Sequence, residues 1–131
     1  MNSYLEDGYV SIWLGMCDSY DELNEYLAAT YDEDGDAINS RFAEDFQFYF
    51  DDDFREADVA DEASGDIEEL LEGFSAYDTF IDEAKASFGN PLAQLYNAAV
   101  LLYDFKYDGD ILDIRHEGLS LDFIGSFKFN Y

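Results

Sequence analysis

The sequence predicts a single α+β domain over residues 1–131, with an N-terminal strand, several helices and then a mainly antiparallel group of C-terminal strands. Three observations indicate this fold class. An aromatic and β-branched segment stands near the start, residues at helical spacing fill the middle, and apolar residues alternate in the last third. A chain of 131 residues is also long enough to bury a sizeable core as one domain.

The first strand is expected over residues 9–16, "YVSIWLGM", because the segment is continuously apolar and is bounded by Gly8 and by "CDS". Ser19 then stands three residues before Glu22, which is the spacing of a capping box and predicts the start of a helix. Helical spacing continues to about residue 30 through four apolar positions: Leu23, Tyr26, Leu27 and Tyr31.

A short second helix is expected where Ile38, Phe42 and Phe46 recur at every fourth position. The segment 46–50, "FQFYF", alternates and favours an extended chain. Residues 51–72 then hold eleven acidic residues against Arg55 alone, and their last part, "DIEELLEGF", has a helical apolar face. Ser75 is a candidate cap for a further helix with inward-facing apolar residues, which Gly89 and Pro91 would end.

The last third is expected to be mostly sheet. Residues 98–107, "AAVLLYDFKY", predict a strand covered on both faces, and "YDGD" predicts a turn after it. Residues 111–114 and 119–129 alternate well enough to be two more strands.

The chain carries 32 Asp and Glu against 6 Lys and Arg, a formal net charge of −26, together with 18% aromatic residues. The aromatic content excludes a disordered acidic tail. Solubility or adaptation to high salt would account for such a charge, but a sharper interpretation is electrostatic steering towards a strongly basic partner. Direct binding of nucleic acid is excluded as a class, because its affinity comes from Lys and Arg on phosphates.

Cys17 is the single cysteine, so the chain forms no internal disulfide and no cysteine-based zinc cluster, and a small buried residue is the expected role. The N-terminal segment lacks the basic and apolar regions of a signal peptide, and no apolar stretch approaches the length of a membrane helix. These observations predict a cytoplasmic protein with no membrane contact.

The segment 32–36, "DEDGD", resembles the opening of a calcium loop but does not meet its requirements. An EF-hand loop beginning at Asp32 needs Gly at its sixth position and Glu at its twelfth, where Ala37 and Ala43 stand. Frames that begin at Asp34 or Thr30 fail as well. We therefore expect a solvated helix-to-helix turn and no metal site.

No catalytic motif supports an enzyme. His116, the single histidine, is expected in an exposed turn, and its neighbour Glu117 would point to the opposite face of a strand. The consecutive carboxylates from Asp51 to Asp53 would need ligands from other segments to hold two metals. The eleven tyrosines suit either the edges of a core or anchors on a protein-binding surface. We predict no catalytic residues and no cofactor.

Several segments in order resemble the immunity protein 22 family of bacterial polymorphic-toxin systems: "VSIWLG", "EYLAATYDEDGDAINSRFAEDF", "DDDFREA", "LLEGFSAYDTFIDEA" and "NAAVLLYDFKYDG". The resemblance spans residues 10–109 and includes Trp13, Gly15 and the turn around Gly35. It implies a cytoplasmic antidote that binds the effector domain of a cognate toxin, and it carries no residue-level contacts. The negative charge suggests that the toxin is a nuclease with a basic cleft.

The predicted toxin-binding surface is the densest acidic run, which follows the aromatic "FQFYF": Asp51, Asp52, Asp53, Glu56, Asp58, Asp61 and Glu62. A solvated acidic loop is the plainer interpretation of the same run. Two other functions remain open at this point. One is a carboxylate-rich, metal-dependent enzyme, and the other is an acidic scaffold protein that has no toxin partner.

Overall fold

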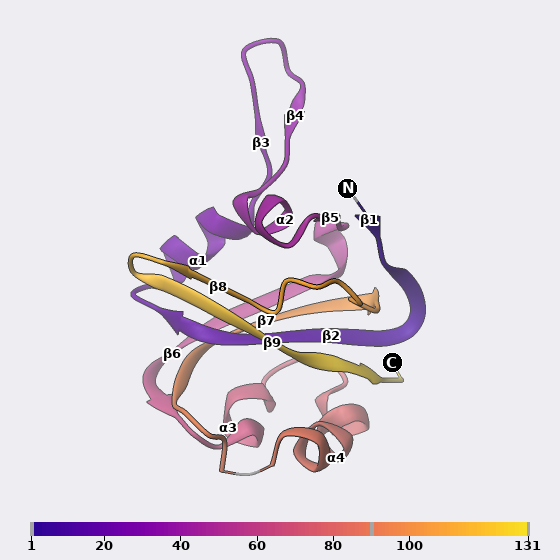
Figure 1. The fold of residues 1–131 in the computed structure, drawn as a ribbon, viewed down its shortest axis with the longest axis vertical. Helices are drawn as coiled ribbons and strands as arrows, with labels where there is room; N and C mark the ends of the chain where they lie inside the picture. Colours follow the sequence, from indigo (N-terminus) through magenta and orange to yellow (C-terminus); the bar gives the residue numbers. More distant parts are fainter. Residues whose placement is uncertain (1, 90, 131) are drawn as a thin grey trace.

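The structure is a computed structural model that describes residues 2–89 and 91–130, and an antiparallel sheet of five strands lies at its centre (Figure 1). The strand order is β6-β7-β2-β9-β8. The central strand β2 (Leu5–Cys17) pairs with β7 (Tyr96–Phe105) on one side and with β9 (Leu119–Lys128) on the other. This arrangement confirms the predicted α+β class, with its N-terminal strand and its antiparallel C-terminal strands.

The strand β8 (Asp113–His116) forms one edge of the sheet and pairs with β9. It lies two residues later than the strand expected at 111–114. His116 is therefore the last residue of a strand and not part of the turn, which consists of Glu117 and Gly118.

The opposite edge is β6 (Arg55–Ser64), which the sequence did not predict. A short 3-10 helix, η1 (Asp52–Phe54), leads into it. Alternate residues Ala57 and Val59 pack against the core on one face, and the carboxylates Glu56 and Asp58 occupy the intervening alternate positions. Pairing with β7 makes this acidic stretch a strand although its own alternation is weak.

Helices cover both faces of the sheet (Figure 1). One layer holds α1 (Tyr20–Leu27) and α2 (Arg41–Phe46), and the opposite layer holds α3 (Ile67–Leu71) and α4 (Tyr77–Phe88). Within the part of the chain that the structure describes, no helix has the length and apolar character needed to cross a membrane.

This three-layer arrangement explains the continuous apolar run of β2. Trp13 belongs to the core beneath α1 and α2, whereas its neighbours Ile12 and Leu14 belong to the core beneath α3 and α4. Successive side chains of a strand point to opposite faces, so a strand covered on both faces needs apolar residues at every position.

Two of the predicted helix ends agree with the structure, whereas α1 ends at Leu27 and not near residue 30, and Tyr31 lies in β3. The Ser19 side chain caps α1 by accepting a hydrogen bond from the Glu22 N–H at 3.1 Å, and Gly89 ends α4. The expected cap at Ser75 is wrong. Ala76 precedes α4 in a left-handed conformation with φ of 59° and offers no side-chain cap, while Ser75 contacts the edge of the sheet.

The segment between α1 and α2 is a β-hairpin, which corrects the expected helix-to-helix turn. Its strands β3 (Thr30–Tyr31) and β4 (Ala37–Ile38) project away from the sheet (Figure 1). Ile38, predicted to begin the second helix, is 45% exposed in β4. The extended chain expected within "FQFYF" is present as β5 (Phe48–Tyr49), which pairs with β1 (Asn2–Ser3).

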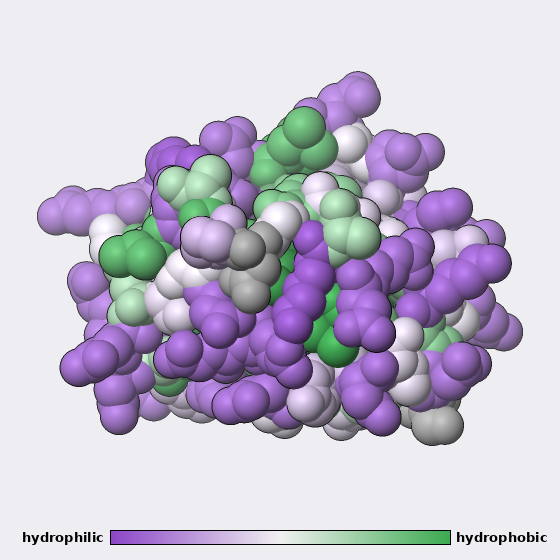
Figure 2. Space-filling view, turned by 90° about the horizontal axis from the view of Figure 1, so that it is seen from below, coloured by the Kyte–Doolittle hydropathy of each residue, from purple (hydrophilic) through white to green (hydrophobic). Residues whose placement is uncertain are grey.

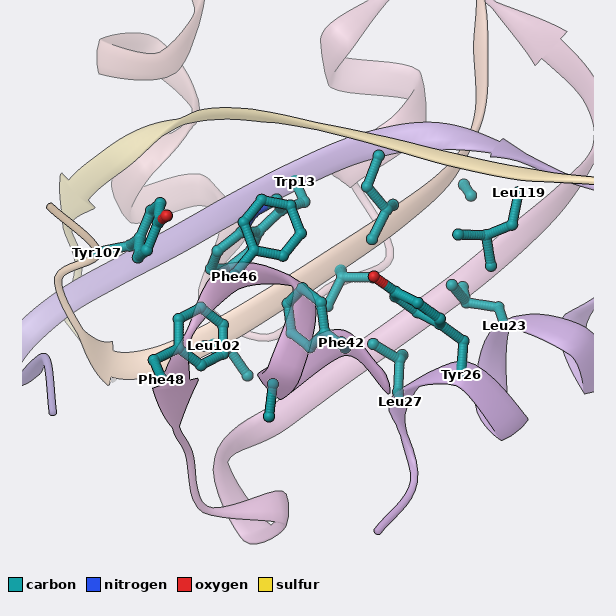
Figure 3. Packing of buried hydrophobic residues seen from close by; sticks show 14 of the residues in the cluster. Trp13, Leu23, Tyr26, Leu27, Phe42, Phe46, Phe48, Leu102, Tyr107 and Leu119 are labelled. Carbon is teal, nitrogen blue, oxygen red and sulfur yellow. The ribbon is translucent and has the colours of Figure 1, made fainter. Parts of the chain in front are cut away.

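Aromatic rings fill the core on the α1 and α2 side, around Trp13 (Figure 3). The Trp13 ring centroid lies 5.1 Å from that of Phe42 and 5.7 Å from that of Phe46, with Phe48 and Tyr107 completing the group. These distances are those of favourable edge-to-face and tilted aromatic pairs. The short helix α2 is therefore held to the sheet chiefly by its phenylalanines.

Candidate functional site

The predicted toxin-binding carboxylates all lie along one edge of the sheet, in and around η1 and β6. Six of them are exposed and Glu56 is partly buried. They differ in what their oxygen atoms contact, so they do not form one uniform surface: Asp51, Asp52, Asp53, Glu56, Asp58, Asp61 and Glu62.

The carboxylates around η1 are occupied partly by their own backbone. The Asp51 side chain caps this turn by accepting a hydrogen bond from the Asp53 N–H at 2.9 Å. Asp52 pairs with the Arg55 Nε at 2.7 Å, where the Arg55 side chain is 13% exposed and that of Asp52 is 59% exposed. Such a surface pair adds little stability. It does, however, neutralise the single cation of the acidic stretch.

Glu56 has a structural role that the sequence did not indicate. Its carboxylate accepts hydrogen bonds from the Ser75 N–H at 2.9 Å and from the Ser75 hydroxyl. The Tyr103 hydroxyl lies 3.1 Å from the same carboxylate and donates to the Ser75 carbonyl oxygen at 2.7 Å. Glu56 therefore fastens the loop between α3 and α4 to the edge strand.

Asp58, Asp61 and Glu62 are directed to solvent. The Asp58 carboxylate accepts a hydrogen bond from the N–H of the next residue, Val59, at 2.9 Å. After Val59 the two strands diverge, because five residues along β6 correspond to two along β7 before Ser64 pairs with Tyr96. Asp61 and Glu62 lie in this unpaired part of β6, and both are exposed.

An open cavity of about 390 Å³ lies beside the first half of β6. One wall comes from α1 and the other from the loop between α3 and α4, and the edge strand forms the floor. Tyr20 of α1 is 49% exposed and contributes an aromatic ring to the first wall. The lining residues are Tyr20, Asn24, Arg55, Glu56, Ala57, Asp58, Gly73, Phe74 and Ser75.

The face that carries α3 and α4 is the one seen in Figure 2. Figure 2 shows this face covered mostly by hydrophilic residues, with separate hydrophobic areas between them. A partner for this protein would therefore meet charged and polar groups over most of this side.

A second polar cluster joins segments that are distant in the sequence, and sequence reasoning missed it. The Asp45 Oδ2 accepts a hydrogen bond from the Tyr26 hydroxyl at 2.6 Å and lies 2.7 Å from the His116 Nε2. Burial, and then the bond to Asp45, raise the pKa of the Tyr26 phenol, which stays protonated. The cluster ties α1 and α2 to the end of β8.

Cys17 is buried, as expected. Its thiol donates a hydrogen bond to the Ser19 carbonyl oxygen at 3.2 Å, and burial raises the pKa of the thiol. A raised pKa disfavours the thiolate, which is the reactive form of cysteine. Burial and the raised pKa therefore disfavour a nucleophilic role for Cys17.

The acidic loop "DEDGD" forms the tip of the β3–β4 hairpin. The Asp32 carboxylate accepts hydrogen bonds from the Asp34 and Asp36 N–H groups at 3.0 and 2.9 Å. Over residues 2–89 and 91–130, no three His, Cys, Asp or Glu side chains are grouped so as to hold a metal ion. The absence of a calcium site remains a prediction.

The structure is that of a small α+β protein with an exposed row of carboxylates along one edge of its sheet. A family model described as Immunity protein 22 matches residues 10–130, and the chain belongs to this family. Membership indicates an immunity function, implies a toxin protein as partner, and suggests an inhibitor and not an enzyme. Neither the curated proteins nor the solved structures contain a significant match.

Proposed function

We propose that the protein neutralises a cognate toxin by binding its effector domain through an acidic edge of the sheet. The acidic edge is defined by the exposed carboxylates of η1 and β6: Asp51, Asp52, Asp53, Asp58, Asp61 and Glu62. The effector domain is a basic nuclease of a bacterial polymorphic-toxin system, and the complex forms in the cytoplasm.

The density of negative charge along the acidic edge carries this proposal. Arg55 is the single cation of the stretch and is already paired with Asp52. A nuclease needs a basic cleft to hold phosphates, and an inhibitor that offers carboxylates can occupy that cleft or its rim. The overall charge of −26 adds long-range attraction, which raises the association rate.

Glu56 belongs to the originally predicted surface but is left out of the acidic edge. Its carboxylate already accepts hydrogen bonds from Ser75. Removing this charge would disturb the loop between α3 and α4 and would not report on toxin binding alone.

The test uses a catalytically inactivated effector domain, taken from the toxin gene that adjoins the gene for this protein. An edge variant replaces exposed carboxylates with their amides: Asp53→Asn, Asp58→Asn, Asp61→Asn and Glu62→Gln. We expect slower association and weaker binding in surface plasmon resonance. A desolvated charge pair that is broken costs roughly 2–5 kcal/mol, whereas rim charges mainly slow association.

A control variant removes the same number of charges from exposed sites away from β6: Glu33→Gln, Asp34→Asn, Asp108→Asn and Asp110→Asn. It lowers the overall attraction equally and leaves the acidic edge intact. If the edge variant and the control variant bind with the same rate and affinity, the contact surface lies elsewhere on the domain. No binding of the wild-type protein would refute the proposed partner itself.

A further inference from the structure

The outer side of β6 is open, and the hydrogen bonds around it show which backbone groups face outward. The Arg55 N–H bonds to the Asp52 carbonyl oxygen, and the Val59 N–H bonds to the Asp58 carboxylate, so neither bonds to β7. In an antiparallel pair, alternate residues direct their N–H and C=O groups to the same side. The N–H of Ala57, midway between these two residues, therefore faces the open side as well.

The rest of the sheet agrees with this assignment. On the central strand, the Cys17 N–H bonds to the side chain of Asn97 in β7, so the N–H groups of odd-numbered β2 residues face β7 there. Gly15 and Trp13 pair with Ala98 and Val100, so the backbone groups of these two β7 residues bond to β2. The backbone groups of the alternate β7 residues therefore point the other way and bond to β6. The β6 residues that pair with these alternate β7 residues are even-numbered, so the N–H groups of the odd-numbered β6 residues face the open side.

The Ala57 N–H is the backbone donor that remains open on this edge. The N–H groups on either side of it in the same row are satisfied within the chain, by Asp52 and by Asp58. Among the described residues, the structure gives the Ala57 N–H no acceptor on that side. An unpaired backbone N–H on an edge strand is a group to which an additional strand can bond.

The surroundings of Ala57 suit an extended segment. The cavity of about 390 Å³ has residues 55–58 as its floor, so the open N–H lies in a hollow and not on a flat surface. Tyr20 and Asn24 form one wall, and the loop that Glu56 holds in place forms the other. Both walls are therefore already in position before a partner arrives, which reduces the entropic cost of binding.

The negative charge of β6 determines which kind of extended segment can pair with its open side. Every copy of this chain carries a net charge of −26, and the strand that would pair carries Glu56, Asp58, Asp61 and Glu62. Like charges on paired strands are destabilising, so a second copy is disfavoured, whereas a basic segment is attracted.

We propose that the open side of β6 receives an extended, Lys- and Arg-bearing segment of the toxin's effector domain as an additional β-strand, hydrogen-bonded at Ala57. This proposal rests on the proposed function and specifies its binding mode. Backbone hydrogen bonds supply the alignment, and the carboxylates along the edge select a basic sequence.

The first experiment compares Ala57→Pro with Ala57→Ser in binding to the inactivated effector domain. Proline removes the N–H and is tolerated where that N–H faces away from the ladder, whereas serine keeps it. We expect Ala57→Pro to fold and to bind at least about tenfold more weakly, and Ala57→Ser to bind as the wild type does. A folded Ala57→Pro variant with unchanged affinity overturns strand addition, while an effect of the edge variant would still uphold the proposed function.

The second measurement uses the wild-type chain, so it does not depend on the folding of a variant. Amide hydrogen exchange of Ala57 should slow at least about tenfold when the effector domain is added. Unchanged exchange in a fully formed complex overturns the proposal. Light scattering of the free protein adds a further test, because a dimer that Ala57→Pro abolishes would mean that a second copy occupies the edge.

Discussion

At the scale of single residues, Gly15 is a position where the sheet has no room for a side chain. A Cβ atom there would lie 1.9 Å from the Ser120 carbonyl oxygen and 2.8 Å from the Leu121 Cδ2. The first contact is with backbone, so relief requires β2 and β9 to move apart. A side chain larger than hydrogen at this position would therefore force the two strands apart.

We predict that Gly15→Ala lowers the free energy of unfolding by about 1–3 kcal/mol, the usual cost of overpacking a core. Urea unfolding followed by fluorescence measures the change, because Trp13 is the single tryptophan and is fully buried. Gly73→Ala is the matched control, since a Cβ there meets nothing within 4 Å. A loss no larger at Gly15 than at Gly73 would contradict the close approach of the strands.

Three buried tyrosines make the fold sensitive to high pH. Burial is the main cause that raises the pKa of Tyr96 and of Tyr107 to about 12, with Asp122 contributing at Tyr96, and it raises that of Tyr26 further. The folded state thus holds these protons more tightly than the unfolded state. Their contribution to stability is complete below the ordinary pKa of 10.0; that of Tyr96 and Tyr107 is lost as the pH rises through about 12, and that of Tyr26 is lost at higher pH.

We therefore expect the free energy of unfolding, measured by circular dichroism in urea, to fall steeply above about pH 10. Tyr26→Phe should begin about 1 kcal/mol less stable near neutral pH, because it loses the bond to Asp45. Its stability should then decline with a shallower slope, since one proton fewer is released on unfolding. Parallel curves for the variant and the wild type would show that Tyr26 does not carry this dependence.

At the scale of elements, Glu56 links the edge strand to the loop between α3 and α4. We predict that Glu56→Ala lowers the free energy of unfolding by about 0.5–1.5 kcal/mol, because the exposed Ser75 N–H and hydroxyl exchange their acceptor for water. Amide exchange in residues 73–76 should rise at the same time. Glu56→Gln keeps one acceptor oxygen, so its free energy of unfolding should fall less. An equal fall in both variants would mean that the negative charge matters more than the hydrogen bonds.

How far each element could be predicted from the sequence depends on where its stabilising contacts come from. The strand over residues 9–16 and the cap at Ser19 were predictable from the local sequence. A continuous apolar run indicates burial on both faces, and the capping-box spacing indicates the start of a helix. The strand β6 was not predictable. Its alternating apolar positions are only Ala57 and Val59, and its conformation depends on β7, about 40 residues later in the chain.

The candidate site shows the same limit. Its carboxylates are consecutive or nearly so, and the sequence could place them on one segment. It could not show that Glu56 contacts Ser75 and Tyr103, nor that His116 contacts Asp45 across 71 positions. Those contacts come from the packing of the α3–α4 loop and of α2 against opposite edges of the sheet, for which no local pattern exists.

At the scale of the whole molecule, negative charge dominates the electrostatics. Ion pairs in the described residues include Arg55 with Asp52, Lys85 with Glu68 and Arg115 with Asp122, but 32 acidic groups face only 6 Lys and Arg. Most carboxylates therefore repel one another without local compensation. Selection for binding a basic partner would maintain this cost, since the same charge speeds association.

Salt should therefore stabilise the free protein, although salt bridges alone would predict the reverse. The screening length falls to ~10 Å at about 0.1 M, which weakens repulsion among exposed carboxylates more than it weakens the few close pairs. We predict a higher melting temperature in about 0.3 M sodium chloride than in dilute buffer, measured by calorimetry. The edge variant, which has less repulsion to screen, should melt higher in dilute buffer and gain less from salt. A melting temperature that stays flat or falls with salt would mean that the carboxylates are already spaced so that their repulsion is small. The charge would then cost the fold little stability, and its presence would no longer support binding to a basic partner.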